Sequence, residues 1–202
     1  MQVLIPFKPT NPKSRLREVL SKAERMELAK RMLLDVLDAL NEIDCEIKIL
    51  STSHFDLEGY EVEVDERELD SAVNSRIKDE TAVIMSDLPL LNKNILEDFF
   101  DTKGDVVIAP GRRGGTNMII VRDPRFKVSY YHCSFLKHVE IAKNLNMKVE
   151  VFDSFYASVD IDTPDDLIEI LIHGKGKRSY SYLYSIGFRL KLEREPKLIR
   201  IM

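Results

Sequence analysis

Three aspartates in two separate segments are the residues best suited to chemistry. Asp87 follows the apolar run 82–85, and Asp160 and Asp162 lie two positions apart later in the chain. Open α/β sheets bind ligands where their buried strands end, and Asp87 stands at such a place. On an extended segment, side chains two positions apart point to the same side. If the fold brings the three carboxylates together, they would form an all-oxygen Mg²⁺ site of the kind that works alongside substrate phosphates.

Asp87 and Asp162 also have purely structural interpretations. Asp87 stands before a Leu-Pro pair, which is typical of a turn. Either Asp162 or Thr163 could cap the helix that is expected to follow. Asp165 and Asp166 fall in the first turn of that helix, where negative charge suits the helix dipole, and we expect them to be structural.

A basic loop follows the first expected strand. Lys8, Lys13 and Arg15 crowd the segment 8–16. Such side chains neutralise a triphosphate, and backbone amides of the turn near Ser14 would add hydrogen bonds. The alternative is a solvated basic loop without a ligand. The loop lacks the glycine-lysine signature of a P-loop.

A second loop, at 111–117, is rich in glycine. Its glycines would let the backbone approach a ligand closely, although a hairpin turn with exposed charge is the alternative. Ser134 opens an expected helix, where its hydroxyl could cap the helix or hold a phosphate or carboxylate. We expect Cys133 to act as a small apolar residue, and His132 and His138 to be structural.

Alternating strand and helix patterns separate these segments. A helix should begin after Ser21, because Glu24 completes a capping box, and its apolar stripe continues to Leu40. Further helices are expected at 69–77, 93–100, 134–146 and 164–172, and strands at 3–7, 46–51, 61–65, 81–85, 105–109, 117–121 and 149–152. This alternation predicts an α/β sandwich with a mainly parallel sheet, to which 117–152 could add an antiparallel pair.

The sequence texture changes after residue 177. Residues 188–192 alternate, 193–196 resemble a turn, and 198–201 are apolar again. We therefore expect a main domain at 1–177 and a C-terminal hairpin extension at 178–202. The hairpin could dock on its own subunit or form a dimer contact.

The composition is that of an ordinary globular protein. The 202 residues are 44% hydrophobic and 32% charged, with a net charge of −4. This balance argues against nucleic acid or a membrane surface as a partner. No apolar run approaches the ~20 residues of a membrane helix, and the start of the chain is unlike a signal peptide. Two widely spaced cysteines, and four histidines without metal-binding spacing, favour the cytoplasm and argue against a zinc site.

Taken in order, the motifs resemble those of the archaeal 2-phospho-L-lactate guanylyltransferase family. The motifs are Ile5-Pro6-Phe7-Lys8, Lys13-Ser14-Arg15-Leu16, Asp87-Leu88-Pro89-Leu90, Gly114-Gly115-Thr116-Asn117, Ser134-Phe135 and the segment 160–167. The resemblance implies a Rossmann-like, glycosyltransferase-A-type nucleotidyltransferase fold. It also implies an enzyme that joins GTP and 2-phospho-L-lactate, giving lactyl-2-diphospho-5′-guanosine and pyrophosphate in coenzyme F-420 biosynthesis. Separately, we expect a homodimer, with the C-terminal hairpin as its contact.

The resemblance also implies roles for single residues. Mg²⁺ would be held by Asp87, Asp160 and Asp162. The nucleotide would be bound by Lys8, Lys13, Ser14, Arg15 and Asp87, of which Lys13, Arg15 and Asp87 are catalytic, and the phospho-acid by Gly115, Thr116 and Ser134. Candidates for a guanine pocket are Asp65, Asp70 and Asn74.

Three alternatives remain open at this point. The acid substrate could be phosphoenolpyruvate. The enzyme could be another small nucleotidyltransferase, for a sugar or the molybdenum cofactor, although the absence of a Gly-x-Gly first loop argues against both. A non-catalytic nucleotide-binding assembly protein is the third, and three carboxylates in a pure binder would lack a purpose.

Overall fold

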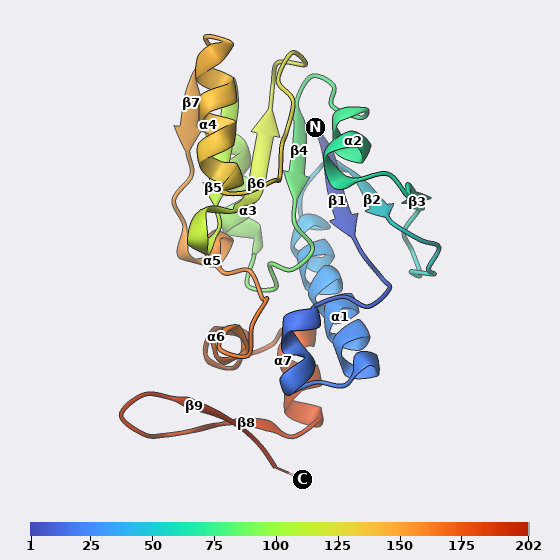
Figure 1. Cartoon of the computed structure of the whole chain (residues 1–202), viewed down its shortest axis with the longest axis vertical. Helices are drawn as coiled ribbons and strands as arrows, with labels where there is room; N and C mark the ends of the chain where they lie inside the picture. The colour runs from blue at the N-terminus through green and yellow to red at the C-terminus, as the bar shows by residue number, and fades with distance from the viewer. Residues whose placement is uncertain (202) are drawn as a thin grey trace.

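A seven-stranded mixed sheet forms the centre of the molecule in our computed structural model, which describes residues 1–201 (Figure 1). The strand order is β3-β2-β1-β4-β6-β5-β7. The strands are β1 (Gln2–Phe7), β2 (Glu46–Ser51), β3 (Val62–Val64), β4 (Thr81–Ile84), β5 (Val106–Pro110), β6 (Thr116–Val121) and β7 (Val149–Val151). Only β6 runs antiparallel to its neighbours in this sheet, β4 and β5. The predicted α/β fold with a mainly parallel sheet is therefore confirmed.

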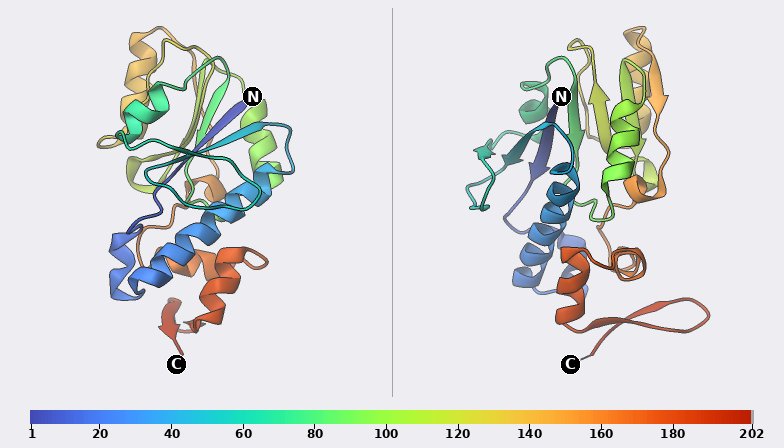
Figure 2. Two further views of the ribbon diagram at one scale, coloured as in Figure 1. Left: turned by 90° about the vertical axis from the view of Figure 1, so that its right-hand side faces the viewer. Right: turned by 180° about the vertical axis from the view of Figure 1, so that it is seen from behind.

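Helices cover both faces of the sheet (Figure 2). One face packs against α1 (Lys22–Leu40) and α3 (Lys93–Asp101), and the other against α2 (Leu69–Asn74) and α4 (Ser134–Asn144). Side chains alternate along β1, so Val3 and Ile5 enter the first core and Leu4 enters the second. All three are fully buried. A sheet with two buried faces explains why its central strands are continuous apolar runs.

The capping box predicted for α1 is present. The Glu24 N–H donates to the Ser21 hydroxyl at 3.3 Å, and the Ser21 N–H donates to the Glu24 carboxylate at 2.8 Å. The apolar stripe of the helix, including Leu28, Met32 and Val36, is fully buried against the sheet. Each such side chain contributes about 1.5–3 kcal/mol, so the helix is held chiefly by packing.

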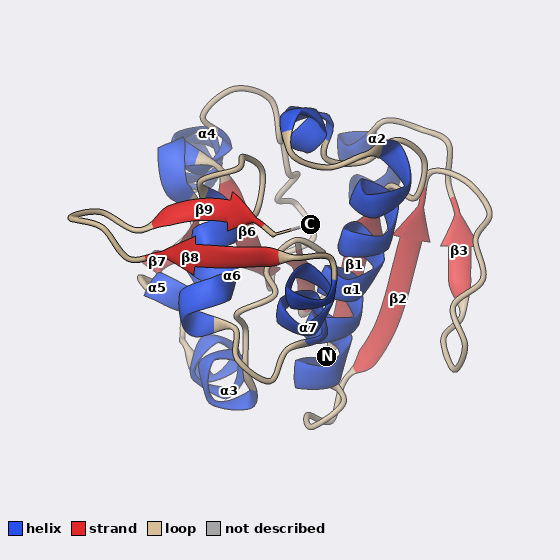
Figure 3. Cartoon of the chain, turned by 90° about the horizontal axis from the view of Figure 1, so that it is seen from below, coloured by secondary structure: helices blue, strands red, loops and turns tan. Residues whose placement is uncertain are grey.

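The last part of the chain forms a helical layer and a separate hairpin below the sheet (Figure 3). It contains α5 (Phe155–Ser158), α6 (Asp166–His173), α7 (Arg178–Ser185), β8 (Phe188–Lys191) and β9 (Lys197–Arg200). The antiparallel β8–β9 hairpin is as predicted. Helix α7 was not predicted; it packs on α1, where Asp35 accepts hydrogen bonds from the N–H groups of Arg178 and Ser179 at 2.6 and 3.0 Å. The domain division at residue 177 stays a prediction.

Several predicted helix boundaries are wrong; α4, for example, ends at Asn144 rather than at residue 146. The second helix ends at Asn74 rather than at residue 77, because the backbone hydrogen bond that completes its last turn is donated by the next residue, Ser75, to Ser71. Helix α6 begins at Asp166 rather than at Pro164, because the Asp166 carboxylate binds the backbone N–H groups of Asp162 and Thr163 and folds this stretch into a turn. Among residues 1–201, no helix is long and apolar enough to cross a bilayer.

Candidate active site

A pocket of about 510 Å³ opens at the carboxyl ends of β1 and β4. Strand β1 has β2 on one side and β4 on the other, so the chain order reverses there, as at the ligand crevices of open α/β sheets. The basic loop that follows β1 forms one wall. The lining residues from other segments include Leu50, Thr52, Asp65, Arg67, Leu69, Ala72, Ser86, Asp87 and Asp162. The pocket thus joins the predicted phosphate loop to two of the three predicted carboxylates.

Lys13 lies between two carboxylates. Its ammonium donates hydrogen bonds to Asp87 and, at 2.9 Å, to Asp162. Burial opposes the charge on Lys13, but the two carboxylates outweigh it and raise the Lys13 pKa. Arg15 donates to the other oxygen of Asp162 at 3.1 Å, while its own side chain stays 67% exposed. One ammonium therefore brings together carboxylates from two distant segments.

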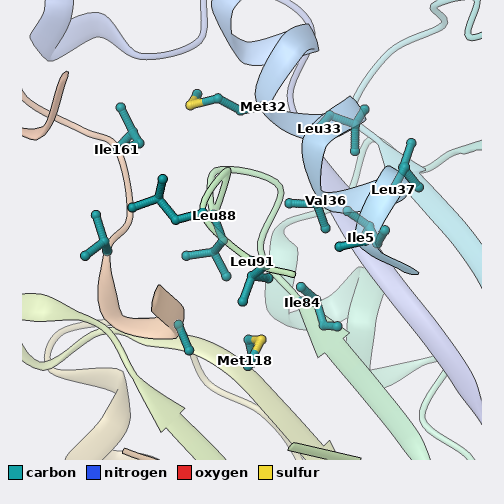
Figure 4. Close-up of a cluster of buried hydrophobic side chains, with 14 of the residues drawn as sticks. Ile5, Met32, Leu33, Val36, Leu37, Ile84, Leu88, Leu91, Met118 and Ile161 are labelled. Atoms are coloured by element: carbon teal, nitrogen blue, oxygen red, sulfur yellow. The ribbon is translucent and has the colours of Figure 1, made fainter. Parts of the chain in front are cut away.

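Apolar anchors hold these carboxylates in place. Leu88, next to Asp87, and Ile161, between Asp160 and Asp162, are both fully buried in the larger core (Figure 4). The backbone N–H of Ile161 also donates to the Asp87 carbonyl at 3.2 Å. These contacts align the segment 160–162 with the loop that follows β4, so Asp87 and Asp162 line the pocket while Leu88 and Ile161 enter the core, and Asp160 is not part of the lining.

Asp160 belongs to the same electrostatic cluster. Burial and the negative charge of Asp87 raise its pKa, and the charge of Asp162 adds to this effect. Its carboxylate lies 3.5 Å from the side-chain amide of Asn117. In residues 1–201, no three acidic, histidine or cysteine side chains are already grouped as metal ligands. Lys13 supplies the positive charge where Asp87 and Asp162 converge.

Asp166 holds the backbone of the segment that carries Asp162, which agrees with the structural role predicted for it. Its carboxylate accepts from the N–H groups of Asp162 at 2.9 Å and Thr163 at 2.6 Å, and forms an ion pair with Arg112. Burial opposes its charge, but these hydrogen bonds outweigh burial and lower its pKa. Because Asp162 points to Lys13, it does not cap the helix, and Asp165 also makes no capping bond.

The glycine-rich loop is shaped by a close contact. A Cβ on Gly111 would lie 2.2 Å from the Asn117 side-chain oxygen, so any other residue there would displace the Asn117 side chain. Gly114 has a φ of +82°, which glycine adopts without strain. Beside Gly115 there is open space, since nothing lies within 4 Å of where its Cβ would be.

The hydroxyls of Thr116 and Ser134 lie next to each other, 3.2 Å apart, and both residues are only 4% exposed. Neither lines the 510 Å³ pocket. Ser134 does not cap α4, because Cys133 occupies that position in a left-handed conformation. The two hydroxyls predicted to hold the phospho-acid are therefore together, behind the loop that carries Gly115.

The guanine-pocket candidates separate into two groups. Asp65 lines the pocket, where hydrogen bonds from Arg67, and then from Arg76, lower its pKa. Asp70 accepts from the N–H of Tyr130 at 2.8 Å, and Asn74 similarly binds the backbone nearby, so both hold a neighbouring loop. Arg67 is a pocket residue that the sequence did not single out; its spacing of two from Asp65 was the available signal.

The fold is that of the nucleotidyltransferases. A solved structure from Desulfovibrio desulfuricans G20, provisionally assigned as a nucleotide-diphospho-sugar transferase, is 17% identical with a TM-score of 0.74, and the match covers 92% of this chain and 95% of that one. The 2-C-methyl-D-erythritol 4-phosphate cytidylyltransferase from Thermus thermophilus is 12% identical with a TM-score of 0.54, covering 87% and 98%. At these identities the likeness establishes the architecture.

Sequence relatives specify the family within that class. The profile described as "Guanylyl transferase CofC like" matches residues 1–202. The 2-phospho-L-lactate guanylyltransferase of Archaeoglobus profundus is 68% identical over 201 residues, covering 100% of this chain and 98% of the relative. That of Archaeoglobus fulgidus is 54% identical, covering 99% and 97%. The chain belongs to the CofC-like guanylyltransferase family, so the resemblance and the enzyme class predicted from the sequence are confirmed.

Proposed function

We propose that this enzyme transfers the guanylyl group of GTP to 2-phospho-L-lactate, releasing pyrophosphate and forming lactyl-2-diphospho-5′-guanosine for coenzyme F-420 biosynthesis. The names of the archaeal relatives support these substrates. The structural observation that carries the proposal is the convergence of Asp87 and Asp162 on Lys13 in the pocket after β1.

The pocket has the composition that a nucleotide requires. Lys8, Ser14 and Arg15 line its basic side, where they would meet the triphosphate. Leu50, Leu69 and Ala72 supply apolar surface on the side of β2 and α2, which suits a purine ring. Arg67 and Asp65 stand at this end as polar groups that could contact the base edge.

The residues fit a magnesium ion. Asp87 and Asp162 already converge on one cationic group, and the pKa of Asp160 is raised by burial and then by the charge of Asp87 close to it. Oxygen ligands of this kind suit Mg²⁺. We propose that these three carboxylates hold it. When bound, the ion would screen the repulsion between two anionic substrates and stabilise charge on the leaving group.

The reaction requires positioning more than proton transfer. A phospholactate oxygen forms a bond to the α-phosphorus of GTP, while the bond from that phosphorus to the bridging oxygen breaks and its electrons leave with pyrophosphate. The attacking phosphate is already ionised near neutral pH, so no general base is needed. Lys13 and Arg15 would stabilise charge that moves onto pyrophosphate. Gly115, Thr116 and Ser134 would orient the acid.

A pyrophosphate-release panel tests this function. GTP, ATP, CTP and UTP are each combined with 2-phospho-L-lactate or phosphoenolpyruvate, with and without Mg²⁺. We expect release with GTP, phospholactate and Mg²⁺ together. Preference for phosphoenolpyruvate would change the acid substrate, and tight GTP binding without any release would favour a non-catalytic binder.

We also propose that the enzyme is a cytoplasmic homodimer with a contact through the hairpin. Leu192, at the turn end of β8, is 90% exposed. Both Cys45 and Cys133 are free thiols, as expected in a reducing compartment. Leu192→Asp should shift the protein from dimer to monomer in sedimentation, whereas a monomeric parent would refute the contact.

A further inference from the structure

A buried histidine contacts two polar groups behind the glycine-rich loop. His138 on α4 has no exposed surface. The backbone N–H of Ser129 donates to its Nε2 at 2.8 Å, and its Nδ1 lies 2.9 Å from Oγ1 of Thr116. An amide N–H can only donate, so Nε2 presents its lone pair and the proton of the neutral ring is on Nδ1. His138 therefore donates to Thr116.

The ring of His138 is fixed in orientation and in charge. Tyr130 meets it edge-on, with ring centroids 5.3 Å apart, and Phe126 packs at 5.8 Å. Burial, with a smaller effect of the nearby Lys137 charge, lowers the His138 pKa to about 4. The ring is consequently neutral near pH 7, and its tautomer is set by the Ser129 amide.

The hydroxyls of Thr116 and Ser134 then have one proton left over. The two groups share one hydrogen bond of 3.2 Å, which uses one of their two protons, whichever hydroxyl donates. The other hydroxyl proton cannot be donated to His138, because Nδ1 already carries a proton and is itself a donor. Within residues 1–201, neither hydroxyl donates to any further atom. A donor left unmatched at this depth is costly, so it calls for an acceptor from outside the chain.

The surroundings of the hydroxyl pair also offer donors and space. Gly115 borders open space, and α4 starts at Ser134 without a side-chain cap on its first amides. We propose that His138 is a positioning residue: it orients the hydroxyls of Thr116 and Ser134 so that they donate to the carboxylate or phosphate of the acid substrate. The inference rests on the proposed function, which assigns these two hydroxyls to the phospho-acid.

Steady-state kinetics of variants test the inference. His138→Phe keeps the ring packing but removes the donor, and we expect the KM for 2-phospho-L-lactate to rise about tenfold or more while the KM for GTP stays unchanged. His138→Gln should recover much of this loss, because its amide can donate to Thr116 and accept from Ser129. His173→Phe, the same substitution at a histidine on α6, is the matched control and should change neither constant. An unchanged acid KM in His138→Phe, or an equal rise in both KM values, would overturn the inference.

A second measurement does not depend on turnover. In the full-length parent with ¹⁵N-labelled histidine, two-bond nitrogen–proton correlations should show a neutral His138 ring protonated at Nδ1 between pH 6 and 8. A ring protonated at Nε2, or at both nitrogens, would refute the proposal even if the enzyme is active. If the parent releases no pyrophosphate with either acid, the proposed function fails instead, and the spectrum still decides the tautomer.

Discussion

The ammonium of Lys13 lies 2.9 Å from the carboxylate of Asp162, a residue 149 positions later in the chain. The same ammonium also contacts Asp87, so a positive charge of the protein itself occupies the point where two proposed Mg²⁺ ligands meet. Without Lys13, the two carboxylates would repel each other in a partly buried site. This relationship suggests that metal binding and nucleotide binding are coupled: the phosphates of GTP can attract Lys13 away from the carboxylates and so free them for the ion.

Replacement of Lys13 tests that coupling. In the parent without nucleotide, Mn²⁺ used as a probe should bind weakly and tighten when GTP is added. Lys13→Met removes the competing charge, so nucleotide-free Mn²⁺ affinity should rise about tenfold, although transfer is lost. Titration followed by electron paramagnetic resonance measures the free ion directly. Arg15→Met is the control, because Arg15 pairs with Asp162, is largely exposed and, within residues 1–201, forms no ion pair with Asp87; a Lys13→Met variant with parental affinity would refute the coupling.

Neutral replacements of the carboxylates should separate catalysis from folding. Asp87→Asn and Asp162→Asn each keep the side-chain shape but remove a metal ligand, so turnover should fall at least about 100-fold. The flanking anchors Leu88 and Ile161 remain buried, and circular dichroism should stay parental. Asp123→Asn, at a partly exposed carboxylate paired with Arg125, is the control. Near-parental turnover in a folded Asp87→Asn or Asp162→Asn variant would remove that residue from the metal site.

Arg15→Ala should affect GTP use much more than stability. Its side chain is 67% exposed, and an exposed ion pair contributes less than about 1 kcal/mol to folding. A charge-assisted bond to phosphate is stronger, so the KM for GTP should rise about tenfold. Thermal unfolding without GTP measures the stability of the variant, and the added stabilisation by GTP measures nucleotide binding. Equal stabilisation of variant and parent by GTP would show that Arg15 does not reach the phosphates.

Local patterns predicted most of the fold because the elements carry their own signals. The predicted bounds of β2 are those observed, and the capping box of Ser21 and Glu24 marks the start of α1. Helix α7 has no comparable signal. Its first amides are capped by Asp35, which precedes them by more than 140 positions and is brought there only by the packing of α7 on α1.

The same limit applies to the site. The position of Asp87 after a buried strand and the spacing of Asp160 and Asp162 predicted a shared site, and the structure brings Asp87 and Asp162 to one pocket. The position of Lys13 between them could not be predicted, because it depends on the left-handed conformation of Lys13 and on three segments meeting. His138 was expected to be structural, and its link to Thr116 depends on how α4 lies against β6.

The stability of the protein should depend on pH through His138. Burial lowers its folded-state pKa to about 4, below the ordinary pKa of 6.5 for an exposed histidine. Between these values the unfolded chain binds the extra proton, so stability is complete above pH 6.5 and is lost as pH falls toward 4. In His138→Gln, the slope of unfolding free energy against pH in this window should decrease by up to about 1.4 kcal/mol per pH unit. Urea unfolding at several pH values gives the slope, with His173→Gln, at a half-exposed histidine, as the control; identical slopes in His138→Gln and the parent would mean that the ring titrates normally in the folded state.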